Sequence, residues 1–297
     1  MSIEKSATRQ SNGHVPPWLK VATTPVAARR LVSAVIPTLN EERNIGWVIG
    51  RIPPQVDEIV LVDGHSTDRT VEVARAVRPD VVVVAQRGRG KGDALCTGFR
   101  HVTGDYVVVL DADGSMDPLE IDYYITALDE GYDFAKGSRF LRGGGSLDLT
   151  RLRTFGNRLL LSTVNQMWRV GFTDLCYGFF AFRRDRLPEL APAATGFEIE
   201  AELIAHALTA RLRIAEVPSV ELPRQYGVSH LHTWRDGNRV LRTVLRERLA
   251  NRPHRIVAAF DRSAMLPLLR QVPVAQLPTT RVSAVVFQPG GKSDVGL

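Results

Sequence analysis

Four short runs of apolar, mostly β-branched residues alternate with helix-like segments in the first half of the chain. The predicted strands are Leu31–Ile36, Glu58–Val62, Val81–Ala85 and Tyr106–Leu110, and the predicted helices between them are Glu41–Ile49, Asp68–Val77 and Asp93–His101. This alternation is typical of a parallel sheet with helices on both faces. It predicts an α/β fold whose ligands bind beyond the carboxyl ends of the strands.

The fourth predicted strand ends in two carboxylates, Asp111 and Asp113, followed by Gly114. In extended backbone, side chains two residues apart point the same way, so both carboxylates can face one point. They repel each other unless a cation lies between them. Hard oxygen ligands favour Mg²⁺ or Mn²⁺, which keep coordination positions open for substrate phosphates. The alternative interpretation is an Asp-Gly turn with solvated carboxylates.

The other strand ends also carry polar or glycine-rich loops. Arg87–Gly92 is basic and suits the rim of a diphosphate site, or is simply a basic surface loop. Asp63 can accept a hydrogen bond from a nucleotide base, or can cap its own turn. Asn40 is a plausible N-cap of the first helix. Neither a dinucleotide-binding Gly-x-Gly-x-x-Gly turn nor a P-loop is present at these strand ends.

The second half of the domain has a mixed pattern. Further predicted elements are the helix Leu119–Glu130, the strand Phe134–Lys136, the helix Arg153–Val170, the strand Tyr177–Phe182 and the helix Phe197–Thr209. Residues 1–29 are interpreted as a mobile N-terminal tail, residues 30–250 as the folded domain, and residues 251–297 as a partly irregular C-terminal extension.

The segment Thr233–Ala250 is predicted to be a basic amphipathic helix. Four arginines fall within one narrow arc, namely Arg235, Arg239, Arg242 and Arg246, and apolar residues fall largely on the other side, namely Trp234, Leu241, Val244, Leu245 and Leu249. Such a helix either lies in an anionic membrane interface or packs its apolar side on the domain with solvated arginines.

Composition limits the partners and the compartment. The 297 residues carry a formal net charge of +6, which suits anionic partners. No apolar stretch approaches the roughly 20 residues that span a bilayer, and the polar N-terminus does not resemble a secretory signal. Two cysteines, Cys96 and Cys176, fit a reducing compartment. We therefore expect a cytoplasmic protein that can contact the inner membrane face peripherally.

Taken together, the motifs resemble those of the family 2 glycosyltransferases, in the branch of dolichol-phosphate mannose and polyprenyl-phosphate sugar synthases. The resemblance covers roughly residues 32–248. The matching segments are Val35–Glu42, Val62–Asp68, Gly90–Leu95 and Asp111–Gly114, followed by Gly137–Phe140, Asp174 with Gly178–Phe179, and Arg224 with Gly227–Ser229. The resemblance implies a GT-A type fold, a Rossmann-like mostly parallel sheet with helices on both faces.

By that resemblance, the donor is a nucleotide-diphosphate sugar, and Asp111 and Asp113 hold its metal, Mg²⁺ or Mn²⁺. The implied donor-binding residues are Pro37, Asn40, Glu41, Asp63, Lys91, Asp111 and Arg224. Many relatives carry two consecutive aspartates where this chain has Val62 and Asp63. The choice between uracil and guanine therefore stays open.

The acceptor side depends on whether the nucleophile is a phosphate or a hydroxyl. A phosphate needs only cations to position it, and Arg139 and Arg224 are candidates. The alternative for Arg139 is a structural ion pair. A hydroxyl needs a general base, for which Asp174, Glu198 and Glu200 are candidates. Glu198 and Glu200 can also be favourable acids in the first turn of a helix. The predicted catalytic set is Asp111, Asp113, Arg139, Asp174 and Glu198.

The predicted function is transfer of a hexose from a donor of the UDP-glucose or GDP-mannose type to a polyprenyl phosphate. The alternative is the same donor chemistry on a soluble hydroxyl acceptor, a saccharide or metabolite. A nucleotidyltransferase would need a glycine- and arginine-rich loop after the first strand, and Pro37–Glu41 is not one. Nucleic acid is not an expected partner, because no basic platform interleaved with aromatic residues is present. The sequence leaves the oligomeric state open.

Overall fold

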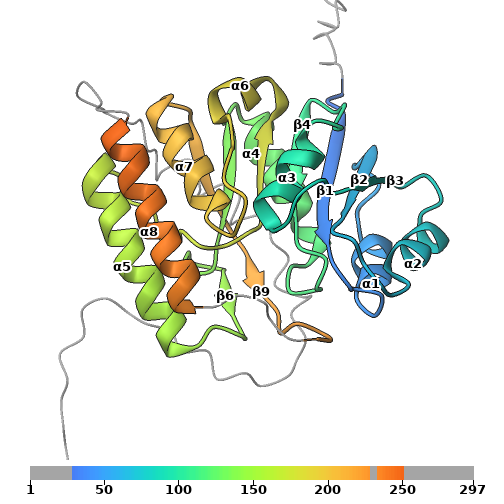
Figure 1. The fold of residues 1–297 in the computed structure, drawn as a ribbon. Coiled ribbons are helices and arrows are strands. Elements are labelled where there is room, and N and C mark those ends of the chain that lie inside the picture. The colour runs from blue at the N-terminus through green and yellow to red at the C-terminus, as the bar shows by residue number, and fades with distance from the viewer. Residues whose placement is uncertain (1–28, 228–232, 251–297) are drawn as a thin grey trace, which may run out of the picture. The chain divides into compact units, whose positions relative to one another are not determined.

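The computed structural model describes residues 29–227 and 233–250 (Figure 1). Seven strands form one sheet in the order β3-β2-β1-β4-β7-β5-β8, and β6 and β9 pair separately. The strands are β1 Val32–Thr38, β2 Glu58–Asp63, β3 Val82–Ala85, β4 Tyr106–Val109, β5 Phe134–Ser138, β6 Gly145–Ser146, β7 Phe180–Arg183, β8 Ile214–Pro218 and β9 Val220–Glu221. The helices are α1 Ile45–Gly50, α2 Thr70–Val77, α3 Lys91–Phe99, α4 Ile121–Asp129, α5 Arg151–Trp168, α6 Leu187–Leu190, α7 Ile199–Thr209 and α8 Thr233–Ala250.

The sheet confirms the predicted, mostly parallel α/β architecture. Strands β1 to β4 are parallel to one another, and β5 is parallel to β8. Only β7 runs antiparallel, between β4 and β5. Because the central residues of β1, β2 and β4 are buried on both faces, these strands are mostly apolar and do not alternate between apolar and polar residues.

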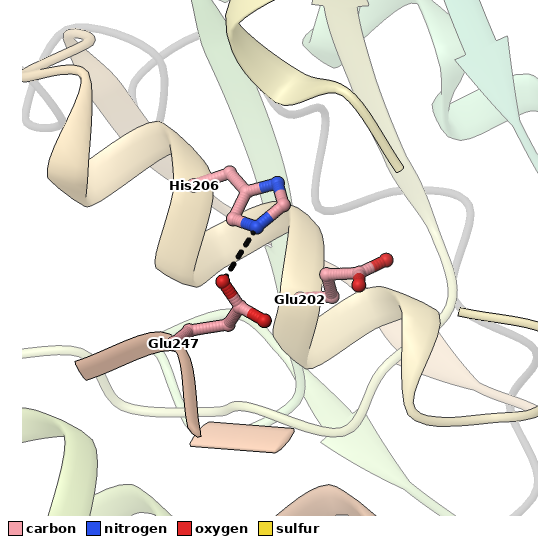
Figure 2. A group of neighbouring side chains, drawn as sticks. All are labelled: Glu202, His206 and Glu247. Carbon is pink, nitrogen blue, oxygen red and sulfur yellow. Dashed lines mark hydrogen bonds and ion pairs between the residues drawn. The ribbon is translucent and has the colours of Figure 1, made fainter. Parts of the chain in front are cut away.

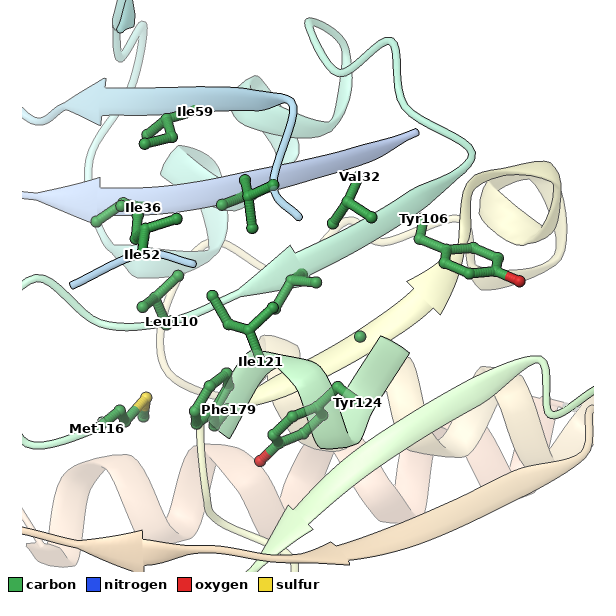
Figure 3. Close-up of a cluster of buried hydrophobic side chains, with 14 of the residues drawn as sticks. Val32, Ile36, Ile52, Ile59, Tyr106, Leu110, Met116, Ile121, Tyr124 and Phe179 are labelled. Atoms are coloured by element: carbon green, nitrogen blue, oxygen red, sulfur yellow. The ribbon is translucent and has the colours of Figure 1, made fainter. Parts of the chain in front are cut away.

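Two hydrophobic cores lie on opposite faces of the sheet. One core packs α1, α2 and α4 against the sheet and includes Ile36, Leu110 and Tyr124 (Figure 3). The other core packs α3, α5, α7 and α8 and includes Leu95, Trp168 and Val244. Helices therefore cover both faces, and the ends of the strands are left for the polar loops.

The prediction that Asn40 caps the first helix is wrong. Helix α1 begins at Ile45, and Asn44 occupies the N-cap position. Asn40 has φ 55°, and its side-chain oxygen accepts a hydrogen bond from the Thr67 N–H at 2.8 Å. An asparagine tolerates this left-handed conformation better than most residues. Asn40 thus joins the loop after β1 to the loop after β2.

Helix α8 has the predicted bounds and buries the predicted side only in part. Of the predicted apolar side, Val244 is buried and Leu241 half-buried, and the arginines Arg235, Arg239, Arg242 and Arg246 are exposed as expected. Two of the expected packing residues instead face outward, since Leu245 is 37% exposed and Leu249 71% exposed. The side chain of Trp234 lies outside the described residues. Within the described ranges, no helix is both long and apolar enough to cross a membrane.

Candidate active site

The parallel strands bring their loops to one edge of the sheet. In the strand register, Thr38 lies opposite Asp63, and Asp63 lies opposite Ala85. Strand β4 ends at Val109, and Asp111 follows it two residues later. At this edge lies a pocket of about 270 Å³, lined in part by Lys91, Asp111 and Asp113. The site therefore forms where open α/β sheets bind ligands.

Asp111 belongs to a half-buried charge triad with Lys91 and Glu200. The Lys91 Nζ atom lies 2.7 Å from Asp111 Oδ1 and 2.8 Å from Glu200 Oε1. Burial lowers the pKa of Lys91, but attraction to Asp111 and Glu200 outweighs it and raises that pKa above its ordinary value. Burial raises the pKa of Asp111 to about 6, against the opposing effect of Lys91. Gly178 leaves the room for this triad, because a Cβ there would lie 2.5 Å from Lys91 Nζ.

Asp113 is paired with a second cation. Arg224 Nη2 lies 2.8 Å from Asp113 Oδ2, and Arg224 Nη1 donates to Glu41 Oε1 at 3.0 Å. The other Asp113 oxygen accepts from the Ser115 N–H at 2.9 Å. Arg224 thus links the loop after β1 to the loop after β4. Val228 and Ser229, which follow it in the predicted motif, lie outside the described residues.

The two strand-end carboxylates suit a divalent cation. Asp111 faces Lys91, and Asp113 faces Arg224. The negative charge of each carboxylate is therefore balanced by a cation in this structure. Their ligand atoms are carboxylate oxygens, which are the ligands that Mg²⁺ and Mn²⁺ prefer. The residues present therefore fit the metal that the sequence predicts.

Arg139 lines the pocket, but its guanidinium is held in a buried ion pair with Asp174. Its Nε and Nη2 atoms contact the two Asp174 oxygens at 2.7 and 3.0 Å. Its Nη1 atom contacts Glu221 Oε2 at 3.1 Å, and Nη2 also donates to the Cys176 carbonyl at 2.9 Å. Asp174 is fully buried, and although burial opposes the shift, Lys136 and Arg139 lower its pKa. This geometry matches the alternative interpretation of Arg139, in which it forms a structural ion pair.

The three candidate bases differ in position. Glu200 lines the pocket and is neutralised by Lys91. Glu198 immediately precedes α7 and accepts from the Gly196 N–H at 3.2 Å, and it does not line the pocket. Asp174 also lies outside the lining and is held by Arg139. The structure therefore places Glu200, rather than Glu198 or Asp174, at the pocket surface.

The predicted base- and ribose-binding residues lie on the loops after β1 and β2. Asp63 accepts from the Ser66 N–H at 3.2 Å, so it caps its own turn in this structure. Asn40 and Glu41 contact Thr67 and Arg224, respectively. Pro37, Asn40 and Asp63 do not contribute to the pocket lining.

Sequence reasoning missed the wall of the pocket that α5 and α8 supply. Arg153, Asn157 and Leu160 reach it from α5, and Asp236 and Val240 reach it from α8. Glu221, which holds Arg139 from β9, was also missed. The helical periodicity identifies which faces of α5 and α8 are buried. It does not show that these faces lie beside the pocket. The sequence offered no local signal for Glu221.

A nucleotide-sugar-dependent glycosyltransferase is the class of enzyme that combines this sheet with a strand-end carboxylate pair at its edge. The chain belongs to that class: residues 33–190 match the model of glycosyl transferase family 2, so it is a member of this family. The fold is the GT-A type expected from the sequence.

Among curated relatives, glycosyltransferase AglJ of Haloferax volcanii is 31% identical over 227 residues, covering 75% of this chain and 73% of that protein. Dolichol-phosphate mannosyltransferase of Pyrococcus furiosus is 30% identical over 210 residues, covering 66% of this chain and 56% of that protein. The chain thus spans little more than half of the second relative. The chain is a hexosyltransferase that uses a nucleotide sugar.

A solved structure of glucosyl-3-phosphoglycerate synthase from Mycobacterium tuberculosis, in complex with Mn²⁺, UDP-glucose and phosphoglyceric acid, superposes with a TM-score of 0.61. It is 27% identical in sequence, and the match covers 74% of this chain and 80% of that one. A second structure of that synthase holds Mg²⁺ and UDP.

Proposed function

We propose that this transferase moves a hexose from a nucleotide-diphosphate sugar, of the UDP-glucose or GDP-mannose type, to a polyprenyl phosphate. On the donor side, Asp111 and Asp113 would hold Mg²⁺ or Mn²⁺, which neutralises charge on the departing nucleoside diphosphate. Lys91 lies beside them as a further cation for the diphosphate. Asp63 and Glu41 are proposed to contact the base and ribose from their loops.

The pocket favours an acceptor that is already an anion. A phosphate oxygen can attack the anomeric carbon without a general base, whereas a hydroxyl requires one. Of the three candidate bases, only Glu200 lines the pocket, and Lys91 lies 2.8 Å from it. A carboxylate held by an ammonium is a weak base. Arg224 and Arg153, which also line the pocket, are the proposed contacts for the acceptor phosphate.

The observation that carries the lipid proposal is an exposed apolar stripe on α5. Leu152, Phe155 and Leu159 are 48%, 68% and 57% exposed, and their spacing places them on one face of the helix. Their neighbours on the same helix, Arg153, Asn157 and Leu160, line the pocket. An acceptor with a phosphate in the pocket would therefore have apolar surface beside it for the polyprenyl chain or the membrane. Exposed Arg151 and Arg158 lie within the same turns and suit anionic lipid headgroups.

The second candidate function is transfer to a soluble phosphorylated acceptor. The structural relative glucosyl-3-phosphoglycerate synthase was solved with phosphoglyceric acid bound. The same basic residues in the pocket would serve a small anionic acceptor, but the apolar stripe on α5 would then have no role in the reaction.

The test is a direct comparison of acceptors. The protein is incubated with UDP-glucose or GDP-mannose and Mn²⁺, and with either a polyprenyl phosphate in vesicles or 3-phosphoglycerate in solution. We expect a lipid-linked sugar as the product. Faster glycosylation of 3-phosphoglycerate would support the second candidate and refute the first.

Two surface variants identify the membrane-facing element. Replacing Leu152, Phe155 and Leu159 with serine should abolish transfer to lipid in vesicles but spare a short, water-soluble polyprenyl phosphate analogue. The matched variant replaces Arg235, Arg239 and Arg242 on α8 with glutamate. Each basic residue near an anionic membrane contributes about 1 kcal/mol, so loss of vesicle binding only in this second variant would assign the contact to α8 instead.

A further inference from the structure

A cluster of one histidine and two glutamates joins α7 to α8, away from the strand-end carboxylates (Figure 2). Glu202 and His206 lie one turn apart on α7, and Glu247 faces them from α8. One potential ligand atom from each residue lies within 4.8 Å of the others. The transfer reaction proposed above uses none of these three side chains.

His206 is oriented so that one ring nitrogen faces a carboxylate. Its Nδ1 lies 2.6 Å from the Leu190 carbonyl oxygen, and a carbonyl only accepts, so Nδ1 carries a proton. In the neutral ring, Nε2 then has a lone pair, which points at Glu247 Oε2 at 2.9 Å. Two acceptors at that distance require a proton or a cation between them. A backbone carbonyl on the remote nitrogen is the arrangement that orients metal-binding histidines.

Glu202 is held by the backbone, whereas the arginine that it shares with Glu247 is exposed. Glu202 is 1% exposed, and its Oε2 accepts from the Ala193 and Ala194 N–H groups at 2.8 Å each. Arg246 Nη2 lies 3.2 Å from Glu202 Oε1 and 2.8 Å from Glu247 Oε1. The Arg246 side chain is 63% exposed, so it can move into solvent while the backbone amides keep Glu202 in place and His206 remains beside Glu247.

We propose that Glu202, His206 and Glu247 form a second divalent-cation site, which takes Zn²⁺ in exchange for the Arg246 guanidinium. A neutral imidazole and two carboxylates supply one nitrogen and two oxygens with a net charge of −2, which a dication balances. Zinc binds such ligands at about 2.0–2.2 Å and can complete its coordination with water. The imidazole favours Zn²⁺ over Mg²⁺ or Ca²⁺, and so separates this site from the all-oxygen pair Asp111 and Asp113.

A cation here would clamp two walls of the pocket together. Helix α7 begins with the turn that carries Glu200, and α8 contributes Asp236 and Val240 to the lining. The Ala193 and Ala194 amides, held by Glu202, belong to the segment whose Thr195 carbonyl accepts from the Asp93 N–H at 3.2 Å. That contact lies two residues from Lys91. The site would therefore fix the elements around the half-buried charge triad without touching substrate.

The first test measures zinc affinity in the full-length protein at mildly alkaline pH, where an ordinary histidine is neutral. Zinc is titrated against a chromogenic chelator for wild type, His206→Gln, Glu247→Gln and Asp113→Asn. We expect the first two substitutions to weaken one zinc site by at least about 10-fold. Asp113→Asn should leave that site intact, which separates it from the proposed donor metal. Far-ultraviolet circular dichroism checks that each variant is folded.

The second test uses the competing cation. Arg246→Met should tighten zinc binding, because the guanidinium no longer has to be displaced. Arg242→Met removes an exposed arginine one turn earlier on α8 and is the matched control, with unchanged affinity expected. This pair keeps the proposal testable even if a ligand variant does not fold.

The site is refuted if wild type binds no zinc, or if His206→Gln and Glu247→Gln bind zinc as wild type does. Weaker zinc binding by Arg246→Met would also overturn it, because the cluster would then be an ion-pair network only. None of these outcomes depends on sugar transfer. A failure of the acceptor experiment would leave the zinc measurement unaffected.

Discussion

At the scale of single residues, Lys91 and Arg224 are each held in the pocket by the carboxylates that they contact. Lys91 separates Asp111 from Glu200, and Arg224 separates Asp113 from Glu41. Four carboxylates can share so small a volume only because these two cations lie among them. A diphosphate and a metal entering together would bring both signs of charge and allow these pairs to exchange partners.

Replacing Asp113 with asparagine keeps the size of the side chain and removes its charge. We expect transfer to fall by at least about 100-fold, the usual effect of removing one electrostatic contact to the reacting group. The fold should persist, because Asp113 lies at the pocket and not in either core. Initial rates with saturating Mn²⁺ measure the effect. Asp80→Asn, which removes a surface carboxylate paired with Arg78, is the control and should behave as wild type.

Arg139 is expected to contribute to stability through its buried pair. Arg139→Met leaves Asp174 buried without its partner, which typically costs about 3–5 kcal/mol. The double variant with Asp174→Leu should recover much of that loss, because neither charge then remains. Urea unfolding of the two single variants and the double variant measures the coupling. Normal stability of Arg139→Met together with lost transfer would instead assign Arg139 to the acceptor phosphate.

At the scale of elements, the sequence predicts helices and strands most reliably in segments where burial alone determines the pattern of apolar residues. Strands β1, β2 and β4 and helix α8 were predicted within two residues because each has a strong apolar period or run. Strand β8 was missed since Glu216 interrupts its apolar pattern. That carboxylate is buried, and it is satisfied from a distant segment by the Thr173 and Asp174 N–H groups. The sequence contains no local trace of such a contact.

The same limit explains the partial success at the site. Asp111 and Asp113 both line the pocket because they follow the same strand closely, but Ala112 and Asp113 lie in a turn and not in the extended backbone that the alternation assumed. The partner of Arg139 could not be chosen in this way, because Asp174 and Glu221 are 35 and 82 residues away. Asn40 was assigned to the wrong element because N-cap propensity is local, whereas its actual partner, Thr67, lies on the next loop.

Glu120, in the turn before α4, should make stability depend on pH. Its Oε1 accepts from the Val220 N–H at 3.0 Å, and burial raises its pKa to about 7 from 4.5. The folded state therefore holds this proton more tightly than the unfolded chain. The stabilisation of the folded state that Glu120 provides is complete below pH 4.5. It is lost as the pH rises towards 7.

The measurement compares wild type with Glu120→Gln, which cannot ionise. Between these pH values, the free energy of unfolding of wild type should fall relative to the variant by up to roughly 3 kcal/mol. Chemical unfolding at several pH values gives the slope of the free energy of unfolding against pH. The comparison with Glu120→Gln isolates Glu120, because all other titratable groups are common to both proteins. Parallel pH profiles would show that folding does not raise the pKa of Glu120.

At the scale of the whole domain, the pocket joins parts that belong to different layers. The strand-end loops supply Asp111 and Asp113, α5 and α8 form the opposite wall, and Arg224 reaches back from the segment after β9. Ion pairs of Lys91 and Arg224 join the strand-end loops, whereas α5 and α8 pack on the sheet through the apolar core that includes Leu160 and Val240. A ligand that bridges them should therefore stabilise the domain as a unit.

The last prediction is that nucleoside diphosphate and metal raise the unfolding temperature together. At a ligand concentration 100 times Kd, binding adds about 2.7 kcal/mol to the stability of the folded state. UDP and GDP are each tested with and without Mn²⁺, and the one with the larger shift identifies the base that the loops after β1 and β2 prefer.

Asp113→Asn should lose the part of the shift that requires Mn²⁺, because a carboxylate ligand is gone. Asp63→Ala should lose the shift both with and without Mn²⁺, since its proposed contact is to the base and not to the metal. If Asp63→Ala is stabilised as fully as wild type, Asp63 only caps its turn, as it does through the Ser66 N–H in this structure.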